Sequence, residues 1–162
     1  MFDRQIEQSV EIVARPSEVW WQLTNFDSYP DWNPLYKRVK GELREGARLA
    51  VTVDPNGVPA MIVRPRIIIA EPERELRWRG RIALPHAFTA EHAFIIKSVG
   101  VDRVRFTQRE RFEGLLVPGA LLLIESALGR GFREMNDALK QRAEAAHASR
   151  EVAEDENTER PI

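Results

Sequence analysis

The sequence predicts an α+β domain in which a curved antiparallel sheet packs against one long C-terminal helix. The chain has 162 residues, which is about the length of one domain. Between residues 36 and 112, consecutive segments with alternating apolar and polar residues are separated by short turns, a pattern typical of an antiparallel sheet. After Gly114, apolar residues recur at three- and four-residue steps, which indicates a helix.

Residues 5–35 predict one strand, one helix and a short turn or one-turn helix. Gln5–Val13 is predicted to be a strand because its apolar residues lie at even spacing. Pro16 suits the first position of a helix, where its missing N–H costs nothing, and this helix should run to about Phe26. Two prolines and several turn-forming residues then interrupt it, which leaves a short turn or one-turn helix before residue 35.

The remaining elements follow from the same reasoning. Six further strands are predicted, at Tyr36–Gly41, Ala47–Asp54, Ala60–Glu71, Glu75–Ile82, Thr89–Ser98 and Val101–Phe112. The amphipathic helix should end near residue 146. From His147 the sequence is polar and lacks aromatic residues, so we predict one domain over residues 1–146 and a disordered tail over 147–162.

In two of the predicted strands, the residue pattern predicts which face is buried. In Glu75–Ile82 and Val101–Phe112 the arginines occupy odd positions, so the even positions should face the interior. Acidic residues accompany these arginines, and the net charge is −1. We therefore interpret the stripe as a solvated sheet face and expect no nucleic-acid partner. The predicted exposed residues are Arg77, Arg79, Arg103, Arg105, Arg109 and Arg111.

Composition excludes several classes of site. Without cysteine the chain has no disulfide, thiolate nucleophile or Cys-based metal site, and its three histidines show no metal-binding spacing. We expect neither a metal nor a cofactor. Charged residues lie where a signal peptide would be apolar, and the apolar run Leu115–Leu128 is too short and too interrupted to span a membrane. We therefore expect a cytoplasmic protein.

Five motifs carry a resemblance to a known superfamily. They are A-R-P-x-x-V-W (Ala14–Trp20), F-D-x-Y-P-x-W-N-P (Phe26–Pro34), E-x-x-L-R-W-R-G (Glu73–Gly80), R-E-R-F-E-G (Arg109–Gly114) and F-R-E-M-N-D-A-L-K (Phe132–Lys140). With these motifs the chain resembles the START-like (SRPBCC) helix-grip superfamily, and in particular its bacterial branch of polyketide cyclases and lipid transport proteins. The resemblance implies a seven-stranded sheet wrapped around the C-terminal helix, two short helices after the first strand, and a ligand cavity between sheet and helix.

The inner positions of the sheet and the underside of the helix then define a candidate ligand site. Most of its members are apolar, as is usual for ligand pockets, and the cavity should exceed roughly 300 Å³. We predict a lining of Trp78, His92, Phe94, Phe106, Gln108, Glu110, Leu128, Phe132 and Met135. Gly129 and Gly131 in the helix indicate a kink or a close approach of the backbone to the sheet or ligand.

Two polar residues on this inner face are the candidates for chemistry. The strands Thr89–Ser98 and Val101–Phe112 should form a hairpin with a three-residue loop, in which His92 lies opposite Glu110 or Gln108. A carboxylate on an apolar face has to be paired, hydrogen-bonded or protonated. His92 and Glu110 would then act as a structural pair, as a polar anchor for a ligand, or as an acid–base pair.

Three functions remain open from the sequence. The first is binding of a hydrophobic or amphipathic small molecule, such as a lipid, polyketide or aromatic metabolite, in the internal cavity. The second is an enzyme of the cyclase, dehydratase or hydrolase type that uses His92 and Glu110. The third, which rests on the resemblance, is a protein-interaction module like the activator of Hsp90 ATPase, with Trp21 as the candidate contact because it points away from the apolar helix face.

Overall fold

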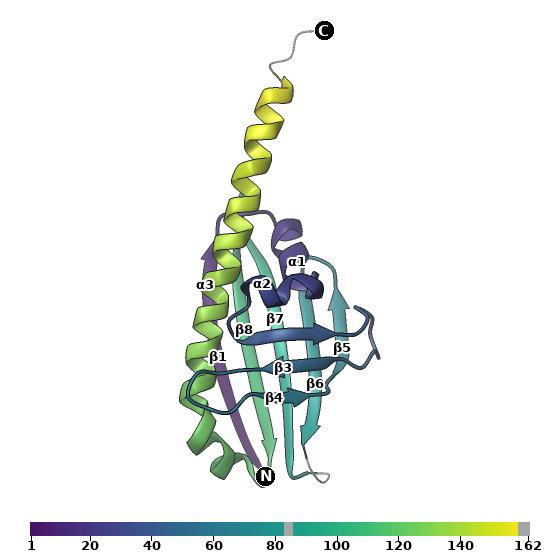
Figure 1. The fold of residues 1–162 in the computed structure, drawn as a ribbon, viewed down its shortest axis with the longest axis vertical. Helices are drawn as coiled ribbons and strands as arrows, with labels where there is room; N and C mark the ends of the chain where they lie inside the picture. Colours follow the sequence, from purple (N-terminus) through teal and green to yellow (C-terminus); the bar gives the residue numbers. More distant parts are fainter. Residues whose placement is uncertain (83–85, 159–162) are drawn as a thin grey trace.

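The computed structural model describes residues 1–82 and 86–158 and shows two sheets flanked by one long helix (Figure 1). A five-stranded sheet has the order β1-β8-β7-β6-β5, and a three-stranded sheet has the order β2-β3-β4. All strand pairs described are antiparallel. The elements are β1 (Phe2–Ile12), α1 (Pro16–Thr24), a 3₁₀ turn (Phe26–Ser28), α2 (Tyr29–Trp32), β2 (Tyr36–Lys40), β3 (Ala50–Val53), β4 (Met61–Val63), β5 (Arg66–Glu71), β6 (Glu75–Ile82), β7 (Phe88–Gly100), β8 (Arg103–Gly114) and α3 (Val117–Thr158).

The predicted α+β helix-grip fold is confirmed, with one strand more than expected. The single strand predicted over residues 60–71 is divided into β4 and β5 at Pro65, which has no N–H to donate to a ladder. The carbonyl of Pro65 accepts a hydrogen bond from the Leu49 N–H at 2.8 Å, and the Ile67 N–H donates to the carbonyl of Ala47 at 2.9 Å. These bonds connect the two sheets, and Figure 1 shows the small sheet lying across the large one.

The hairpin of β7 and β8 has the predicted facing. Its turn consists of Val101 and Asp102, and a bulge between Ser98 and Gly100 supplies the extra residue that we had assigned to a three-residue loop. The bulge keeps even-numbered residues opposite even-numbered residues. His92 therefore pairs with Glu110, one of the two predicted registers.

The arginine stripe lies on the outer face, as predicted. Arg109 pairs with Glu7 at 2.6 Å and Arg111 with Asp3 at 2.6 Å, which ties β8 to β1. Arg77 and Arg79 both contact Glu91 on the neighbouring strand. Every arginine of the stripe thus has a carboxylate partner, which explains how four arginines are tolerated on one face of β8.

Helix α3 is longer than predicted: residues 147–158, which we expected to be disordered, are helical, and residues 159–162 of the predicted tail lie outside the described residues. Figure 1 shows its last turns projecting beyond the sheets. Residues 147–158 remain helical because Ala, Glu and Arg are strong helix formers and Arg150 pairs with Glu154 one turn away at 3.3 Å. His147, where the tail was to begin, is buried. Within the described residues, no helix is both long and apolar enough to cross a bilayer.

One end of the space between sheet and helix is filled by side chains. Phe94 and Phe106 of the sheet and Phe132 and Met135 of α3 are all fully buried there. A Cβ added at Gly131 would lie 2.8 Å from Leu35 Cδ1, so this glycine allows the close approach of α3 that the sequence indicated. Nothing comparable faces Gly129.

Candidate functional site

A cavity of about 490 Å³ lies between the two sheets and the N-terminal part of α3. Its size exceeds the predicted minimum for a ligand site. The walls come from both sheets and from α3, and most of the lining is apolar. The apolar residues are Val51, Val53, Pro55, Met61, Ile62, Val63, Pro65, Trp78, Gly80, Phe88, Ala90, Phe112, Ile124 and Leu128, and the polar ones are Tyr36, Arg64, Arg81 and Glu110.

The exposure of the lining residues shows which side of the cavity faces solvent. Ile62 is 60% exposed, and Arg64 and Arg81 are also exposed. At the opposite side, Tyr36 and Phe112 are buried. The cavity therefore opens along the end of β4 and β6 and is closed at Tyr36.

Two small residues create the space. Gly80 on β6 pairs with Ala90 on β7, and Ala90 pairs with Phe112 on β8, so these positions form one row across the inner face. Since a glycine and an alanine occupy the β6 and β7 positions of this row, little side-chain volume projects from these two strands. In the row of Leu76, Phe94 and Gln108, large side chains fill the corresponding space.

The cavity lies nearer to the C-terminal end of β6 and the N-terminal end of β7 than we predicted. Of the nine residues predicted to line it, Trp78, Glu110 and Leu128 are on its wall. His92 lies behind Glu110 and Tyr36. The other five are buried in the filled end, namely Phe94, Phe106, Gln108, Phe132 and Met135. The alternation of the strands predicts which face is inside but does not predict where along that face a void remains.

The closed end of the cavity carries a polar cluster of Tyr36, His92 and Glu110. The Tyr36 hydroxyl lies 3.1 Å from His92 Nδ1, and Glu110 Oε2 lies 3.4 Å from the same nitrogen. His92 Nε2 is buried without a hydrogen-bond partner in the described part of the chain, and the imidazole ring packs against the rings of Phe94 and Phe132. A proton on Nδ1 therefore places the ring N–H beside its two acceptors, with the lone pair of Nε2 against apolar atoms.

Burial determines the protonation of Tyr36. It raises the pKa of this phenol well above the ordinary value, and the negative charge of Glu110 adds to the effect. Tyr36 is thus a neutral hydroxyl at physiological pH. Because it lines the cavity, it can donate a hydrogen bond to a ligand or accept one.

Tyr36 was missed in the sequence analysis, although the motif before it sets its position. The side-chain oxygen of Asn33 accepts hydrogen bonds from the backbone N–H groups of Leu35 at 3.0 Å and Tyr36 at 2.8 Å. Asn33 is itself buried. This arrangement turns the chain into β2 with Tyr36 directed inward, where its ring meets Trp78 and His92 edge to face.

Gln108 has a different role from the one predicted. Its side-chain amide donates to the carbonyl of Phe132 at 3.2 Å and to Asn136 Oδ1 at 2.6 Å. Both amide side chains are almost fully buried. Gln108 therefore connects β8 to α3 in the filled end of the interior, away from the cavity.

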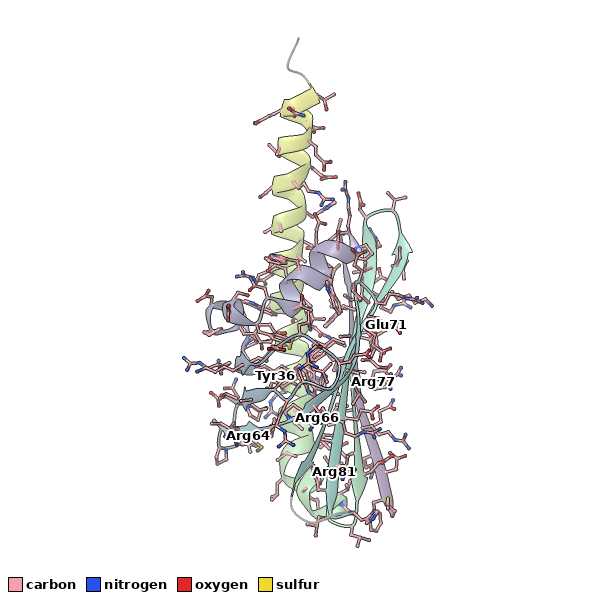
Figure 2. The ribbon with its side chains drawn as sticks, turned by 90° about the vertical axis from the view of Figure 1, so that its right-hand side faces the viewer. Tyr36, Arg64, Arg66, Glu71, Arg77 and Arg81 are labelled. Atoms are coloured by element: carbon pink, nitrogen blue, oxygen red, sulfur yellow. The ribbon has the colours of Figure 1, made fainter. Side chains whose placement is uncertain are left out.

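The open end of the cavity carries positive charge. Figure 2 shows Arg64, after β4, and Arg81, on β6, near the same end of the two sheets, and both residues border the cavity, Arg81 from an odd-numbered, exposed position at its rim. Among the described residues, neither guanidinium lies within ion-pair distance of a carboxylate, unlike the arginines of the outer stripe. The cavity thus has a cationic open end and a closed end with the Tyr36 hydroxyl and the Glu110 carboxyl.

A comparison with protein families identifies the chain. Residues 3–144 match the family described as polyketide cyclase / dehydrase and lipid transport. The chain belongs to this family. The match confirms the predicted START-like membership and covers both sheets and most of α3, and therefore every residue that lines the cavity. No sequence match to a curated protein was found.

Solved structures show the same fold as this polyketide cyclase / dehydrase and lipid transport family member. The ZhuI aromatase/cyclase from Streptomyces sp. R1128 is 19% identical over 88% of this chain and 94% of its own, with a TM-score of 0.72. A START superfamily protein from Mycobacterium smegmatis is 20% identical over 88% and 98%, with a TM-score of 0.69. Norcoclaurine synthase from Thalictrum flavum, in complex with dopamine and hydroxybenzaldehyde, is 15% identical over 86% of both chains, with a TM-score of 0.65.

Trp21 of this family member lies outside the cavity. It is 63% exposed on α1 and borders a shallow depression beside α3. Its exposure agrees with the predicted orientation away from the core. Its contact with a partner protein stays a prediction.

Proposed function

We propose that the protein binds an amphipathic small molecule of the lipid, polyketide or aromatic metabolite type in the cavity between its sheets and α3. The observation that carries this proposal is the 490 Å³ cavity with a largely apolar wall. Ligand pockets commonly have such a wall with a few polar groups that fix the orientation of the ligand. Here those groups lie at the two ends, so an elongated ligand fits best.

The charges favour a ligand with an anionic or carbonyl-rich end. Arg64 and Arg81 have no carboxylate partner within the described structure, and both border the cavity. Guanidinium groups bind carboxylates and phosphates through paired hydrogen bonds. The apolar body of the ligand would then lie along Trp78 and Ala90, with a hydroxyl or other hydrogen-bonding group near Tyr36.

Trp78 offers a direct readout of binding, since its ring forms part of the cavity wall. We would titrate the protein with a long-chain fatty acid and with the alcohol of equal chain length and follow tryptophan fluorescence. We expect saturable binding that is tighter for the acid, with a signal that Trp78→Phe removes. Absence of saturable binding by either compound, and by an aromatic polyketide mimic, would contradict the proposal.

The role of the two arginines is tested separately. Arg64→Gln and Arg81→Gln should reduce the preference for the acid over the alcohol, each by roughly 10-fold if one charge-assisted contact of about 1.5 kcal/mol is lost. The matched control is Arg105→Gln, which removes an arginine from the outer face. If both cavity variants retain the full preference, the anionic end of the ligand lies elsewhere.

A second candidate function is catalysis at the closed end. The Glu110 carboxylate lies on the cavity wall with His92 3.4 Å behind it, and Tyr36 shares the same ring nitrogen. This set would allow Glu110 to remove a proton from a bound substrate while Tyr36 donates a hydrogen bond to a carbonyl oxygen. Turnover of a poly-β-ketone mimic that is lost in both Glu110→Gln and Tyr36→Phe would support an enzyme. Binding without turnover would leave the protein as a carrier.

A further inference from the structure

A second polar cluster lies at the end of the molecule away from the cavity opening. It joins α1, the β7–β8 turn and the extended part of α3. Asp102 of the turn and His147 and Glu151 of α3 each offer one possible ligand atom, and these atoms all lie within 4.8 Å of one another. His147 and Glu151 are four residues apart, so they share one face of the helix.

His147 is the central residue of this cluster. Its side chain is only 5% exposed. Its Nδ1 lies 2.9 Å from Glu18 Oε2, which makes Glu18 the natural acceptor for a proton on Nδ1. Glu18 is buried as well and is held by the backbone N–H of Arg15 at 2.7 Å. The contact with Glu18 therefore fixes the orientation of the His147 ring.

The other ring nitrogen, Nε2, has no hydrogen bond in the described structure. Nε2 lies 3.5 Å from Glu151 Oε1 and 3.9 Å from Asp102 Oδ2. A bare lone pair that faces two carboxylates is unfavourable, so Nε2 has to carry either a proton or a metal cation. A histidine whose Nδ1 is bound by a carboxylate while Nε2 faces other ligands is the usual arrangement in metal sites.

The charges of the surrounding groups also favour a bound cation. Four carboxylates, of Glu18, Asp102, Glu151 and Glu154, meet two guanidinium groups, of Arg15 and Arg150. These six side chains together carry two negative charges in excess. One divalent cation would balance them.

We propose that Asp102, His147 and Glu151 bind a divalent transition metal of the Zn²⁺ type, with Glu18 as the residue that orients His147. Ligands about 2.0–2.1 Å from a tetrahedral Zn²⁺ lie about 3.3–3.4 Å apart. The separations of Nε2 from the two carboxylate oxygens are 3.5 and 3.9 Å, and all three atoms lie within 4.8 Å of one another, so the side chains would have to move inward to hold the ion. Glu151 is largely exposed and can adjust, while Asp102 keeps its other oxygen for Arg15 at 3.2 Å.

The site would clamp the β7–β8 turn to the extended part of α3. This inference departs from our expectation of no metal, which was based on spacing along the chain. Asp102 and His147 are far apart in sequence, so no short motif contains both. The proposed metal site does not depend on the proposed ligand cavity.

The test is titration of the full-length, chelator-treated protein with Zn²⁺ and with Co²⁺ at neutral pH. Calorimetry should give one site per chain, Co²⁺ should develop the visible absorption of a low-symmetry site, and Zn²⁺ should raise the thermal midpoint. Asp102→Asn and Glu151→Gln, which leave His147 and Glu18 in place, should each weaken binding by at least about 10-fold. The matched control, Glu156→Gln, lies exposed further along the same helix and should bind normally.

Two results would overturn the proposal. One is the absence of one-to-one Zn²⁺ binding. In that case a nitrogen NMR signal that shows His147 protonated on both ring nitrogens would mean that a proton provides the positive charge. The other is Zn²⁺ binding that remains unchanged in both Asp102→Asn and Glu151→Gln.

Discussion

Substitution of Ala90 by leucine distinguishes an empty cavity from a packed core. Ala90 lies between Gly80 and Phe112 in the inner row of the sheet, where the structure leaves open volume. Leucine adds three carbon atoms there. At about 0.8 kcal/mol for each buried methylene, the gain in the free energy of unfolding is at most about 2.4 kcal/mol. We expect Ala90→Leu to leave stability unchanged or to raise it by up to this amount.

The control is the same substitution in the filled part of the interior. Ala143 is fully buried in the core. Extra methylenes in a packed core usually cost about 1–3 kcal/mol, so Ala143→Leu should be destabilised by that amount. Urea unfolding of both variants, after removal of bound small molecules, measures the difference. If Ala90→Leu loses as much stability as Ala143→Leu, the space beside Gly80 is not available to a ligand.

Two further predictions concern the polar groups of the interior. Gln108→Leu and Asn136→Leu should each cost about 1–3 kcal/mol of unfolding free energy because a buried partner loses its hydrogen bond, and the double variant should cost less than the sum. An additive result in a urea-unfolding cycle would mean that the 2.6 Å contact between them contributes nothing. Burial raises the pKa of both tyrosines of the chain, Tyr29 and Tyr36, so their stabilising contribution is complete below about pH 10 and declines above it. The unfolded state then releases protons that the folded state keeps, and stability should fall by about 1.4 kcal/mol per pH unit for each tyrosine. Phenolate absorbance should appear together with unfolding, and Tyr29→Phe should halve the fall of the unfolding free energy with pH. Phenolate absorbance in the folded protein near pH 10 would show that the side chains are accessible to water.

The sequence predicts the fold well because its strands and helix repeat with clear periods. The arginine stripe determined the facing of β6 and β8, and the parity of the hairpin restricted His92 to Glu110 or Gln108. The bulge at Ser98 was not predictable, but it preserves the same parity that the three-residue loop would have given.

The location of the cavity could not be obtained from the same pattern. Alternation treats Phe94, Phe106 and Trp78 alike, since all three are large residues on the inner face. A better signal was the pair of small inner residues, Gly80 and Ala90, on adjacent strands. The role of Tyr36 depends on how the small sheet folds over the large one, which is a contact between distant segments. The continuation of α3 was missed because composition alone does not show that His147 is buried against Glu18.

The most direct test of the ligand-binding account is native mass spectrometry of the protein purified without denaturant. We predict that the wild-type chain carries one equivalent of an apolar or amphipathic small molecule. Ala90→Trp, which projects an indole into the cavity, should lose this bound mass. Lys97→Trp, which adds the same ring to the exposed outer face of β7, should retain it. A wild-type protein without bound mass that also takes up none from added lipid extract, or equal retention in the two variants, would contradict the account.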